Sequence, residues 1–267
     1  MFRKRSHLLL FLLPVYLLQS CDEPAIGEPV YSAEMILKDE ETTLNYLRGT
    51  VTLSDDFSGY DELEKQISKK DFLTGLTTGE YLPMLLKSKT GGKVYKLHKI
   101  HGPISDYCKD YIVFESKKTL KYYLMEGKKV ANYNFVDLNG KIYNEITMRG
   151  KIVVLKFWFL GCINCIQEMP EMNKIVRKYQ GNDEVVFLSL AFDKPEALNN
   201  FLKKTTFLYA TVPDQKHYIT EVLDIQLFSS HMLIDKKGKI VKVVSEYPEI
   251  EKSLDALADK DLRDNMN

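Results

Sequence analysis

A nearly continuous apolar stretch runs from Ile152 to Leu160. Its length and its content of Val, Phe and Trp are typical of a strand that is buried on both faces. From Asn164 onward the apolar positions recur with helical spacing, so the pattern predicts a strand that passes directly into a helix. The residues on the predicted helical stripe are Ile166, Met169, Met172 and Ile175.

The residues around this stretch predict alternating strands and helices. Phe135–Tyr143 has the pattern of a hairpin, in which Asn139-Gly140 supplies a turn with positive φ. After the helix, the chain predicts a strand at Glu184–Ala191, a helix at Pro195–Lys204, a strand at Phe207–Val212, a short helix at His217–Leu223, paired strands at Met232–Ile234 and Ile240–Val244, and a helix at Glu249–Ala258. This order predicts an α/β fold with a mixed sheet between helices.

The chain from residue 34 to residue 130 contains no chemical motif. Its patterns predict strands at Leu44–Leu53, Lys93–Ile100 and Tyr111–Phe114, and a helix at Tyr60–Lys69. We therefore expect a small α+β domain over residues 34–130 and a second domain over residues 131–267. The role of the first domain is not revealed by its sequence.

Two features of the first domain have ordinary explanations. His98 and His101 are three residues apart, but the lysines and the Gly-Pro turn around them favour surface histidines over metal ligands. Cys108 falls on the same alternating face as Ile112 and Phe114. A buried, unreactive thiol is therefore favoured over a third redox cysteine.

The charge balance excludes one class of partner. The 267 residues contain 37 Lys+Arg and 37 Asp+Glu, so nothing indicates binding to nucleic acid. The charges are unevenly distributed, because residues 21–80 hold 14 acidic and 5 basic side chains, whereas residues 81–130 hold 4 acidic and 11 basic ones. We expect these two segments to fold against each other.

The N-terminus has the pattern of a secretion signal over residues 1–20. Basic residues at positions 3–5 precede an apolar core, Leu8–Leu18, that is short for a membrane span. The sequence Leu18-Gln19-Ser20-Cys21 resembles the lipobox of bacterial lipoproteins, which implies cleavage before Cys21 and lipidation of that cysteine. An ordinary cleaved signal and an uncleaved anchor are the alternatives. Residues 21–33, with prolines and a glycine, are expected to form a tether.

Two cysteines follow the predicted central strand, Cys162 and Cys165. Cys162 is expected at the N-terminus of the helix, where unpaired N–H groups and the helix dipole stabilise a thiolate. Such a pair serves either redox chemistry or metal binding, and structural zinc usually needs further Cys or His ligands at suitable spacing. Redox chemistry is therefore favoured, and a metal site or an inert structural pair is the alternative.

At this point the sequence resembles the TlpA/ResA-like branch of envelope-anchored thiol-disulfide oxidoreductases, which have a thioredoxin fold. The resemblance covers about residues 132–262. It rests on the hairpin before the strand, on the Cys-x-x-Cys pair, and on these short motifs: Gly150-Lys151, Phe157-Trp158, Glu168-x-Pro170, and Leu233-Ile234-Asp235 with Gly238. The first domain lies outside the resemblance.

The resemblance implies a role for each matching residue. Cys162 matches the attacking cysteine and Cys165 the resolving one. Glu168 matches an acidic residue that handles protons at the buried thiol, although a solvent-facing helix glutamate is the alternative. Trp158 matches the aromatic residue under the site, where a purely structural role is an equal alternative. Pro170 matches the proline that bends the helix, because it lacks an N–H.

Three positions, Lys156, Gly161 and Ser229, depart from the usual pattern. Gly161 stands where many thioredoxins have a second tryptophan just before the first cysteine. Lys156 stands where thioredoxins often have a buried aspartate, and it would favour a thiolate if it faced the dithiol. Ser229 stands where the family has a cis-proline, and since a cis bond is costly before other residues, we expect a trans peptide there. His231 follows, and it either tunes the thiol or lies partly exposed at a sheet edge.

These observations and the resemblance predict an envelope thiol-disulfide oxidoreductase. The habit of the family implies a reductase, and the reverse direction, oxidation of clients, is the alternative. Cys162 would attack a client disulfide and Cys165 would resolve the mixed disulfide, leaving a redox-active Cys162–Cys165 bond. The expected partners are client proteins with disulfides, a membrane-bound electron donor or acceptor, and the membrane itself through the lipid anchor. No cofactor and no resident metal are expected. The alternative is a redox-weakened binding module or adaptor, which the missing loop proline supports.

Overall fold

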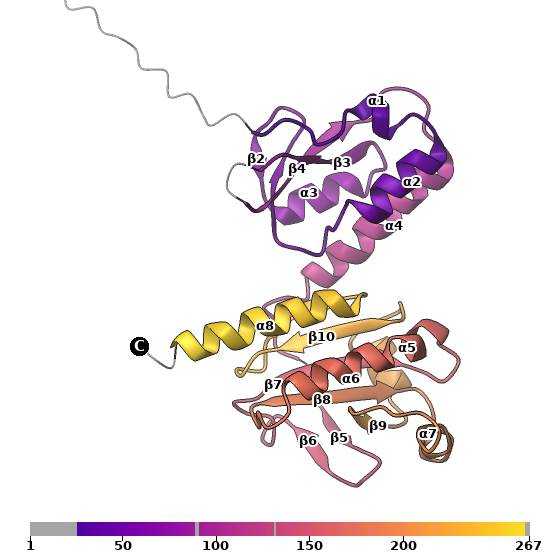
Figure 1. Ribbon diagram of the computed structural model, residues 1–267, viewed down its shortest axis with the longest axis vertical. Helices are drawn as coiled ribbons and strands as arrows, with labels where there is room; N and C mark the ends of the chain where they lie inside the picture. Colours follow the sequence, from indigo (N-terminus) through magenta and orange to yellow (C-terminus); the bar gives the residue numbers. More distant parts are fainter. Residues whose placement is uncertain (1–25, 89–90, 131, 265–267) are drawn as a thin grey trace, which may run out of the picture.

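The computed structural model describes residues 26–88, 91–130 and 132–264, which form two lobes stacked along the long axis (Figure 1). Each lobe has its own main sheet, with four strands in the N-terminal lobe and five in the C-terminal lobe. The expected signal peptide, Cys21 and the start of the expected tether lie outside the described residues. Among the described helices, none is long and apolar enough to cross a membrane.

The N-terminal lobe is an α+β unit. Its elements are α1 (Ala33–Ile36), α2 (Glu40–Gly49), β1 (Phe57–Tyr60), β2 (Gln66–Ile67), α3 (Lys69–Leu76), β3 (Tyr81–Leu86), β4 (Lys93–Lys99) and α4 (Asp106–Tyr123). The sheet order is β2-β1-β4-β3, and β1 and β4 are its parallel pair. Phe72 and Leu76 of α3 pack against Tyr95 of β4 and Ile112 of α4, so this lobe has a core of its own.

One expected strand of this lobe is confirmed and two are helices. The strand expected at Lys93–Ile100 is β4. Leu44–Leu53 lies mostly in α2, because the Asp39 side chain caps the helix and the buried residues recur with helical spacing. Tyr111–Phe114 lies within α4, which begins where Ser105 accepts a hydrogen bond from the Cys108 amide. In both segments, capping and the helical spacing of buried residues outweighed short alternating patterns.

The helix expected at Tyr60–Lys69 is also wrong. β1 ends at Tyr60, and the chain turns back into β2. The Asp61 carboxylate accepts hydrogen bonds from the backbone N–H groups of Leu63 and Lys65, and Glu64 adopts a positive φ of 66°. An aspartate that binds the following backbone favours a turn over a helix, and this local interaction decided the conformation.

The expected attraction between the acidic and basic segments is confirmed. Lys93 lies 2.7 Å from the Asp55 carboxylate, and Lys96 lies 2.8 Å from that of Glu64. Part of the expected tether is attached to the sheet, because the Val30 amide donates to the Leu85 carbonyl over 3.0 Å. The chain is therefore fixed to this lobe from about that point.

The C-terminal lobe is a mixed sheet between helices, as the sequence predicted. Its elements are β5 (Asn134–Val136), β6 (Ile142–Asn144), β7 (Ile152–Trp158), α5 (Ile163–Gln167), α6 (Met169–Lys178), β8 (Val185–Ala191), α7 (Pro195–Leu202), β9 (Ala210–Val212), the π-helix η1 (Tyr218–Val222), β10 (Ser230–Ile234), β11 (Ile240–Val244) and α8 (Tyr247–Asp264). The sheet order is β11-β10-β7-β8-β9, which places β7 at the centre. This arrangement is a thioredoxin-like fold.

The central strand is buried on both faces, which confirms the first expectation. All seven residues of β7 are buried. Ile152 and Val154 pack against α6 and α8 on one face, whereas Val153 and Leu155 face η1 and the hairpin β5–β6 on the other. Two separate apolar layers therefore hold this strand in place, and its C-terminal end becomes a fixed point for whatever follows it.

Helix α4 connects the two lobes. Cys108 lies at its beginning as a fully buried free thiol, with helical spacing to Ile112 in place of the expected alternation, and Ile112 belongs to the N-terminal core. Tyr122, near the other end, belongs to the core of the C-terminal lobe. The chain then continues beside the sheet, where the Gly127 amide donates to the Ile240 carbonyl over 2.8 Å. One helix thus contributes to both cores.

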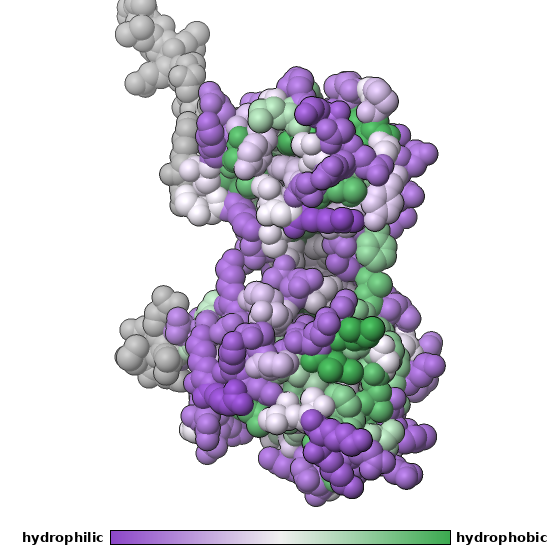
Figure 2. Space-filling model, turned by 45° about the vertical axis from the view of Figure 1, so that its right-hand side comes forward, coloured by the Kyte–Doolittle hydropathy of each residue, from purple (hydrophilic) through white to green (hydrophobic). Residues whose placement is uncertain are grey.

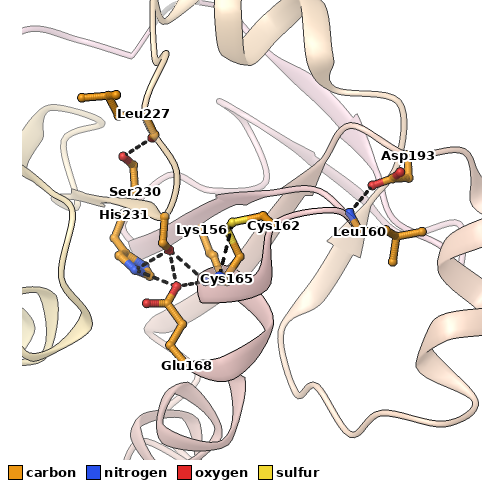
Figure 3. The surroundings of a disulfide bond; sticks show 10 residues. Lys156, Leu160, Cys162, Cys165, Glu168, Asp193, Leu227, Ser230 and His231 are labelled. Carbon is orange, nitrogen blue, oxygen red and sulfur yellow. Dashed lines mark hydrogen bonds and ion pairs between the residues drawn. A yellow bond between two sulfur atoms is a disulfide. The ribbon is translucent and has the colours of Figure 1, made fainter.

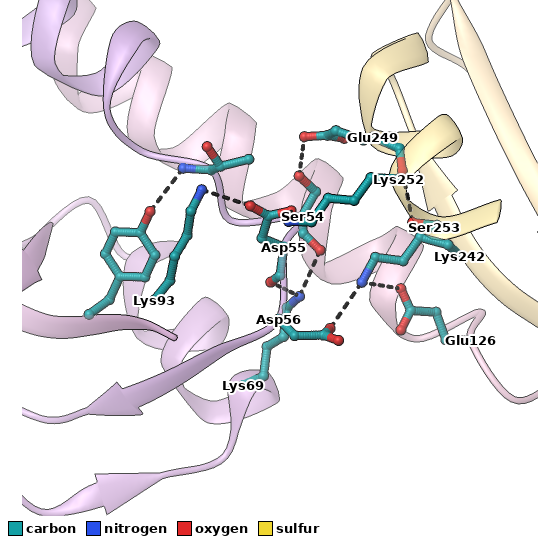
Figure 4. A network of polar contacts seen from close by, with 12 residues as sticks. Ser54, Asp55, Asp56, Lys69, Lys93, Glu126, Lys242, Glu249, Lys252 and Ser253 are labelled. Atoms are coloured by element: carbon teal, nitrogen blue, oxygen red, sulfur yellow. Dashed lines mark hydrogen bonds and ion pairs between the residues drawn. The ribbon is translucent and has the colours of Figure 1, made fainter. Parts of the chain in front are cut away.

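A polar network also joins the lobes (Figure 4). In it, Ser54 donates a hydrogen bond to Glu249. Lys242 lies 3.2 Å from Asp56, and Lys252 lies 3.1 Å from Asp55. These contacts run from the loop before β1 to β11 and α8, so the lobes meet through side chains as well as through α4.

Candidate active site

A disulfide between Cys162 and Cys165 lies just beyond the C-terminal end of β7 (Figure 3). Cys162 is the N-cap of α5, and its sulfur accepts a hydrogen bond of 3.3 Å from the Cys165 amide. Cys162 is 7% exposed, whereas Cys165 is completely buried. The first cysteine thus lies nearer to solvent and beside the free N–H groups of a helix, and the second lies inside the fold.

The helix after the cysteines is interrupted at Glu168. This residue ends α5 and precedes α6, in which Pro170 occupies the first turn. A proline has no N–H to continue the hydrogen-bond ladder and fits the start of a helix, so the expected bend is present. The interruption turns the Glu168 side chain toward the sheet, where it is only 11% exposed.

Four polar side chains form a buried cluster beside the dithiol: Lys156, Glu168, Ser229 and His231. Lys156 and His231 are directly paired in the register of β7 and β10, and both are completely buried. The Lys156 ammonium binds the Glu168 carboxylate and lies 3.2 Å from the Ser229 hydroxyl, which also donates to Glu168. Figure 3 shows Lys156, Glu168 and His231 converging at one point.

His231 is the third side chain of the cluster that contacts the Glu168 carboxylate. Its Nε2 lies 3.3 Å from Glu168 Oε1 and 3.3 Å from Ser229 Oγ, whereas Nδ1 has no hydrogen-bond partner among the described residues. A neutral imidazole with its proton on Nε2 satisfies these contacts, because that nitrogen must donate to the carboxylate. Burial lowers the pKa of His231, and the neighbouring Lys156 lowers it further.

The cluster keeps Glu168 ionised. Burial alone would raise the pKa of Glu168, but the hydrogen bond from His231 and the ammonium of Lys156 outweigh it, and the pKa lies well below its usual range. Burial lowers the pKa of Lys156, and the carboxylate opposes that change. The cluster therefore holds a buried carboxylate as an anion beside the dithiol.

Several sequence alternatives are settled by this geometry. Glu168 is not a solvent-facing residue, and His231 is not an exposed edge residue, because β10 lies between β7 and β11. Lys156 points inward and binds Glu168 and Ser229. Trp158 is completely buried in the same apolar cluster as both cysteines.

The expected trans peptide before Ser229 is wrong, because the Phe228–Ser229 bond is cis. The expectation weighed only the local preference of the chain, whereas tertiary contacts surround this loop. Phe228 packs edge-on against Phe159 and Phe192, with ring centroids 5.6 and 5.1 Å apart. Ser229 is bonded to Glu168, so the loop lies beside the dithiol despite the missing proline.

Two contributors to the site were missed from the sequence. Asp193 accepts a hydrogen bond of 2.8 Å from the Leu160 amide, just before the cysteines (Figure 3). Its position two residues after β8, at the same sheet edge as the end of β7, was a usable signal. Tyr122 lies 2.9 Å from the Ser230 hydroxyl, and no local pattern pointed to it.

No group of three or more His, Cys, Asp or Glu side chains suited to a metal ion occurs within residues 26–88, 91–130 and 132–264. His98 and His101 lie at the end of the N-terminal sheet, where His98 is half-buried and His101 is exposed. Burial, and then the proximity of His101, lower the pKa of His98. These histidines lie outside the cluster around the dithiol.

The sequence of the C-terminal lobe is similar to known proteins. A profile of the AhpC/TSA family matches residues 127–243. The thiol-disulfide oxidoreductase ResA of a Bacillus cereus strain is 34% identical over 122 residues, which are 45% of this chain and 70% of that protein. ResA of Bacillus subtilis (strain 168) is 28% identical over 136 residues, which are 51% of this chain and 75% of that protein.

Among solved structures, the thioredoxin domain of a thiol-disulfide oxidoreductase from Bacteroides vulgatus is 23% identical, with a TM-score of 0.44 over 49% of this chain and 96% of that one. The fold, the Cys-x-x-Cys disulfide and the similarity to the Bacillus proteins define a thiol-disulfide oxidoreductase. Within that class, the chain belongs to the TlpA/ResA-like branch of the AhpC/TSA family.

Proposed function

We propose that this protein reduces disulfides of client proteins at the bacterial cell envelope. The Cys162 thiolate attacks a client disulfide, which forms a mixed disulfide and releases one client thiolate. Cys165 then attacks Cys162, which releases the second client thiolate and leaves the Cys162–Cys165 disulfide. The observation that carries this assignment is the difference between the sulfurs, because only Cys162 combines a helix N-cap with access to solvent.

The buried cluster supports the second step. Cys165 must lose its proton before it attacks, and burial disfavours its thiolate. Glu168 follows Cys165 by three residues and is held as an anion by Lys156 and His231. We assign it as the transient acceptor that passes the proton of Cys165 on to solvent, because a carboxylate with so low a pKa does not retain a proton. In the same scheme the buried Trp158 side chain forms the apolar floor beneath the dithiol, and Ser229 orients the carboxylate of Glu168.

The sequence before the described residues supports the location. A basic stretch, an apolar core and the lipobox-like Leu18-Gln19-Ser20-Cys21 fit a lipoprotein that is anchored through Cys21. Each reaction cycle oxidises the dithiol to the Cys162–Cys165 disulfide, so an electron donor must reduce this disulfide before the next cycle. A membrane-bound thiol donor, which would reduce the Cys162–Cys165 bond by the same exchange chemistry, fits such a location.

Disulfide exchange by the full chain tests the proposal. The wild type should reduce insulin with dithiothreitol as the electron source, Cys162→Ser should be inactive, and Cys165→Ser should accumulate mixed disulfides. Equilibration with glutathione should give a reduction potential nearer to about −270 mV, as in thioredoxin, than to about −120 mV, as in DsbA. A potential near the second value would assign client oxidation instead. Equal trapping by both single variants would contradict the cysteine roles.

No contact among the described residues supports the alternative of a binding module. It rested on the missing loop proline, but the loop lies against the active site, with Ser229 bonded to both Lys156 and Glu168.

A further inference from the structure

An open groove of about 540 Å³ lies between the N-terminal lobe and the active site. One wall is α4, which contributes Phe114 and Lys118. The opposite wall contains Asn164, the residue next to Cys165, and Glu168. Ser229 lies at the loop between them. The groove therefore begins at the residues that surround the dithiol and ends on the N-terminal lobe.

The groove wall on α4 presents an aromatic ring. Phe114 is 50% exposed, although large apolar side chains usually gain by burial. Figure 2 shows hydrophobic side chains at the waist between the lobes and on the adjoining flank of the lower lobe. The Lys118 ammonium lies 6.0 Å from the centre of the Phe114 ring and 2.6 Å from the Glu115 carboxylate. This cation is thus already balanced by a neighbour.

The other charges of the groove leave an acidic surplus. Glu168 is balanced by Lys156, and Glu171 by Lys174 at 2.7 Å. Glu246, which is exposed to solvent, forms no ion pair within 4.0 Å in the described part of the chain. Reduced hydration of the carboxylate and repulsion by Glu168 raise the pKa of Glu246, and the more distant cation of Lys118 only partly offsets these two effects. A positive group in the groove would relieve this repulsion.

The wall on α4 is fixed relative to the dithiol. The Tyr122 hydroxyl, two turns beyond Phe114 on the same helix, lies 2.9 Å from Ser230, the neighbour of Ser229. Both side chains are buried, so this contact holds α4 against the loop of the active site. The aromatic ring and the redox loop therefore keep one geometry, which favours recognition of a defined ligand.

We propose that this groove binds an extended segment of the client polypeptide next to its disulfide, with an apolar side chain on Phe114 and a basic side chain on Glu246. The proposal rests on the proposed function and names its client class. It also gives the N-terminal lobe a role, because α4 supplies one wall of the client site. Because the groove is continuous with Asn164 and Ser229, its occupant is a client that enters the redox site and not an unrelated partner.

Direct binding tests the groove without using the chemistry. The probe is a fluorescein-labelled peptide with phenylalanine two residues before, and lysine two residues after, a central serine that replaces cysteine. A second peptide carries glutamate instead of lysine. Fluorescence anisotropy with the oxidised full chain should show tighter binding of the lysine peptide. Phe114→Ala should weaken binding about five-fold, and Glu246→Gln should reduce the preference for lysine about three-fold.

Two matched variants serve as controls. Tyr107→Ala removes an aromatic side chain that is 55% exposed on the same helix but outside the groove, and Glu62→Gln neutralises an exposed carboxylate of the N-terminal lobe. Both should bind like the wild type. Equal affinity for the two peptides, or the same affinity in Phe114→Ala and Tyr107→Ala, would overturn the groove proposal.

Turnover of a small disulfide separates the two proposals. Hydroxyethyl disulfide is too small to span the groove, so the wild type, Tyr107→Ala and Glu62→Gln should reduce it at equal rates, whereas Cys162→Ser should not. An inactive wild type would refute the proposed function and leave the peptide result to decide the groove.

Discussion

The hydroxyl of Tyr122, on the long helix of the N-terminal lobe, lies 2.9 Å from the hydroxyl of Ser230, the residue with which β10 begins directly after the active-site loop. Ser230 also donates a hydrogen bond of 2.6 Å to the Leu227 carbonyl, so the tyrosine is the remaining donor for its oxygen. Both side chains are buried. The site loop therefore depends on a residue 108 positions earlier in the chain.

This contact should contribute measurably to stability. Tyr122→Phe should lower the free energy of unfolding by about 1 kcal/mol, because one buried hydrogen bond is lost with little change in volume. Urea denaturation of Tyr122→Phe, Ser230→Ala and the double variant measures the coupling between the hydroxyls. We expect a coupling of about 1 kcal/mol. Strictly additive losses would show that the two groups do not interact.

Removing Lys156 should be far more damaging than removing a surface lysine. Lys156→Met leaves the buried Glu168 carboxylate without its cation and should cost about 3–5 kcal/mol of stability. The double variant with Glu168→Gln should recover part of this loss. Lys174→Met breaks the exposed pair with Glu171 and should cost at most about 1 kcal/mol. Equal losses in Lys156→Met and Lys174→Met would contradict the buried ion pair.

Stability should fall as the pH is lowered through the mildly acidic range. The folded state lowers the pKa of His231 below its ordinary value of 6.5 and the pKa of Glu168 below 4.5. In both cases the unfolded state binds more protons, so stability is complete above these values and decreases as the pH falls, first for His231 and then for Glu168. One histidine contributes a slope of at most about 1.4 kcal/mol per pH unit.

The contribution of His231 can be isolated by substitution. His231→Gln keeps a donor for Glu168 but does not titrate, so its stability should change less between pH 6.5 and pH 5. His217→Gln removes an exposed histidine and is the matched control. Urea denaturation at each pH gives the slopes, and an unchanged slope in His231→Gln would show that this histidine does not carry the effect.

The two active-site cysteines should differ in reactivity. In a Cys21→Ser/Cys108→Ser background, Cys165→Ser leaves Cys162 and Cys162→Ser leaves Cys165 as the single cysteine. The rate of alkylation by iodoacetamide against pH should give a thiol pKa for Cys162 below the value of about 8.5 for free cysteine, and a much slower reaction of Cys165. The control is the Cys21→Ser/Cys162→Ser/Cys165→Ser variant, whose buried Cys108 should remain unmodified. Equal rates would remove the basis for the assigned roles.

Lipid attachment should depend on Cys21 alone. Cys21→Ser, expressed in a bacterial host, should no longer be processed to the mature size and should not incorporate labelled fatty acid, because the acceptor thiol is absent. The C-terminal lobe should fold as before, which insulin reduction can verify. Unchanged labelling would rule out the lipoprotein assignment.

The C-terminal lobe was predictable because its sequence patterns are strong. β7 has an unbroken buried pattern, Gly140 marks the hairpin turn with a φ of 81°, and the cysteines mark the start of the next helix. In the N-terminal lobe, short segments carried mixed signals, and capping by Asp39 or a turn at Asp61 decided the outcome. Propensity over four to ten residues is weak against such contacts.

The site was only partly predictable for a different reason. Cys162, Cys165 and Glu168 lie within one local motif. The pairing of Lys156 with His231 depends on the register of two strands that are far apart in sequence, and Tyr122 reaches the site from the other lobe. The cis peptide at Ser229 was missed because the local preference of the chain does not include the packing of Phe228. Long-range contacts of this kind have no local signature.

The sharing of α4 between two cores has a consequence for dissecting the molecule. A fragment that starts at residue 131 would lack Tyr122 and also the segment that pairs with residues 238–240 through Gly127, Lys128 and Val130. The edge strand β11 would then be free to pair with a strand of a second molecule. The smallest fragment that keeps the redox lobe intact therefore includes the end of α4. The position in the sequence that separates the two lobes thus differs from the position that separates their hydrophobic cores.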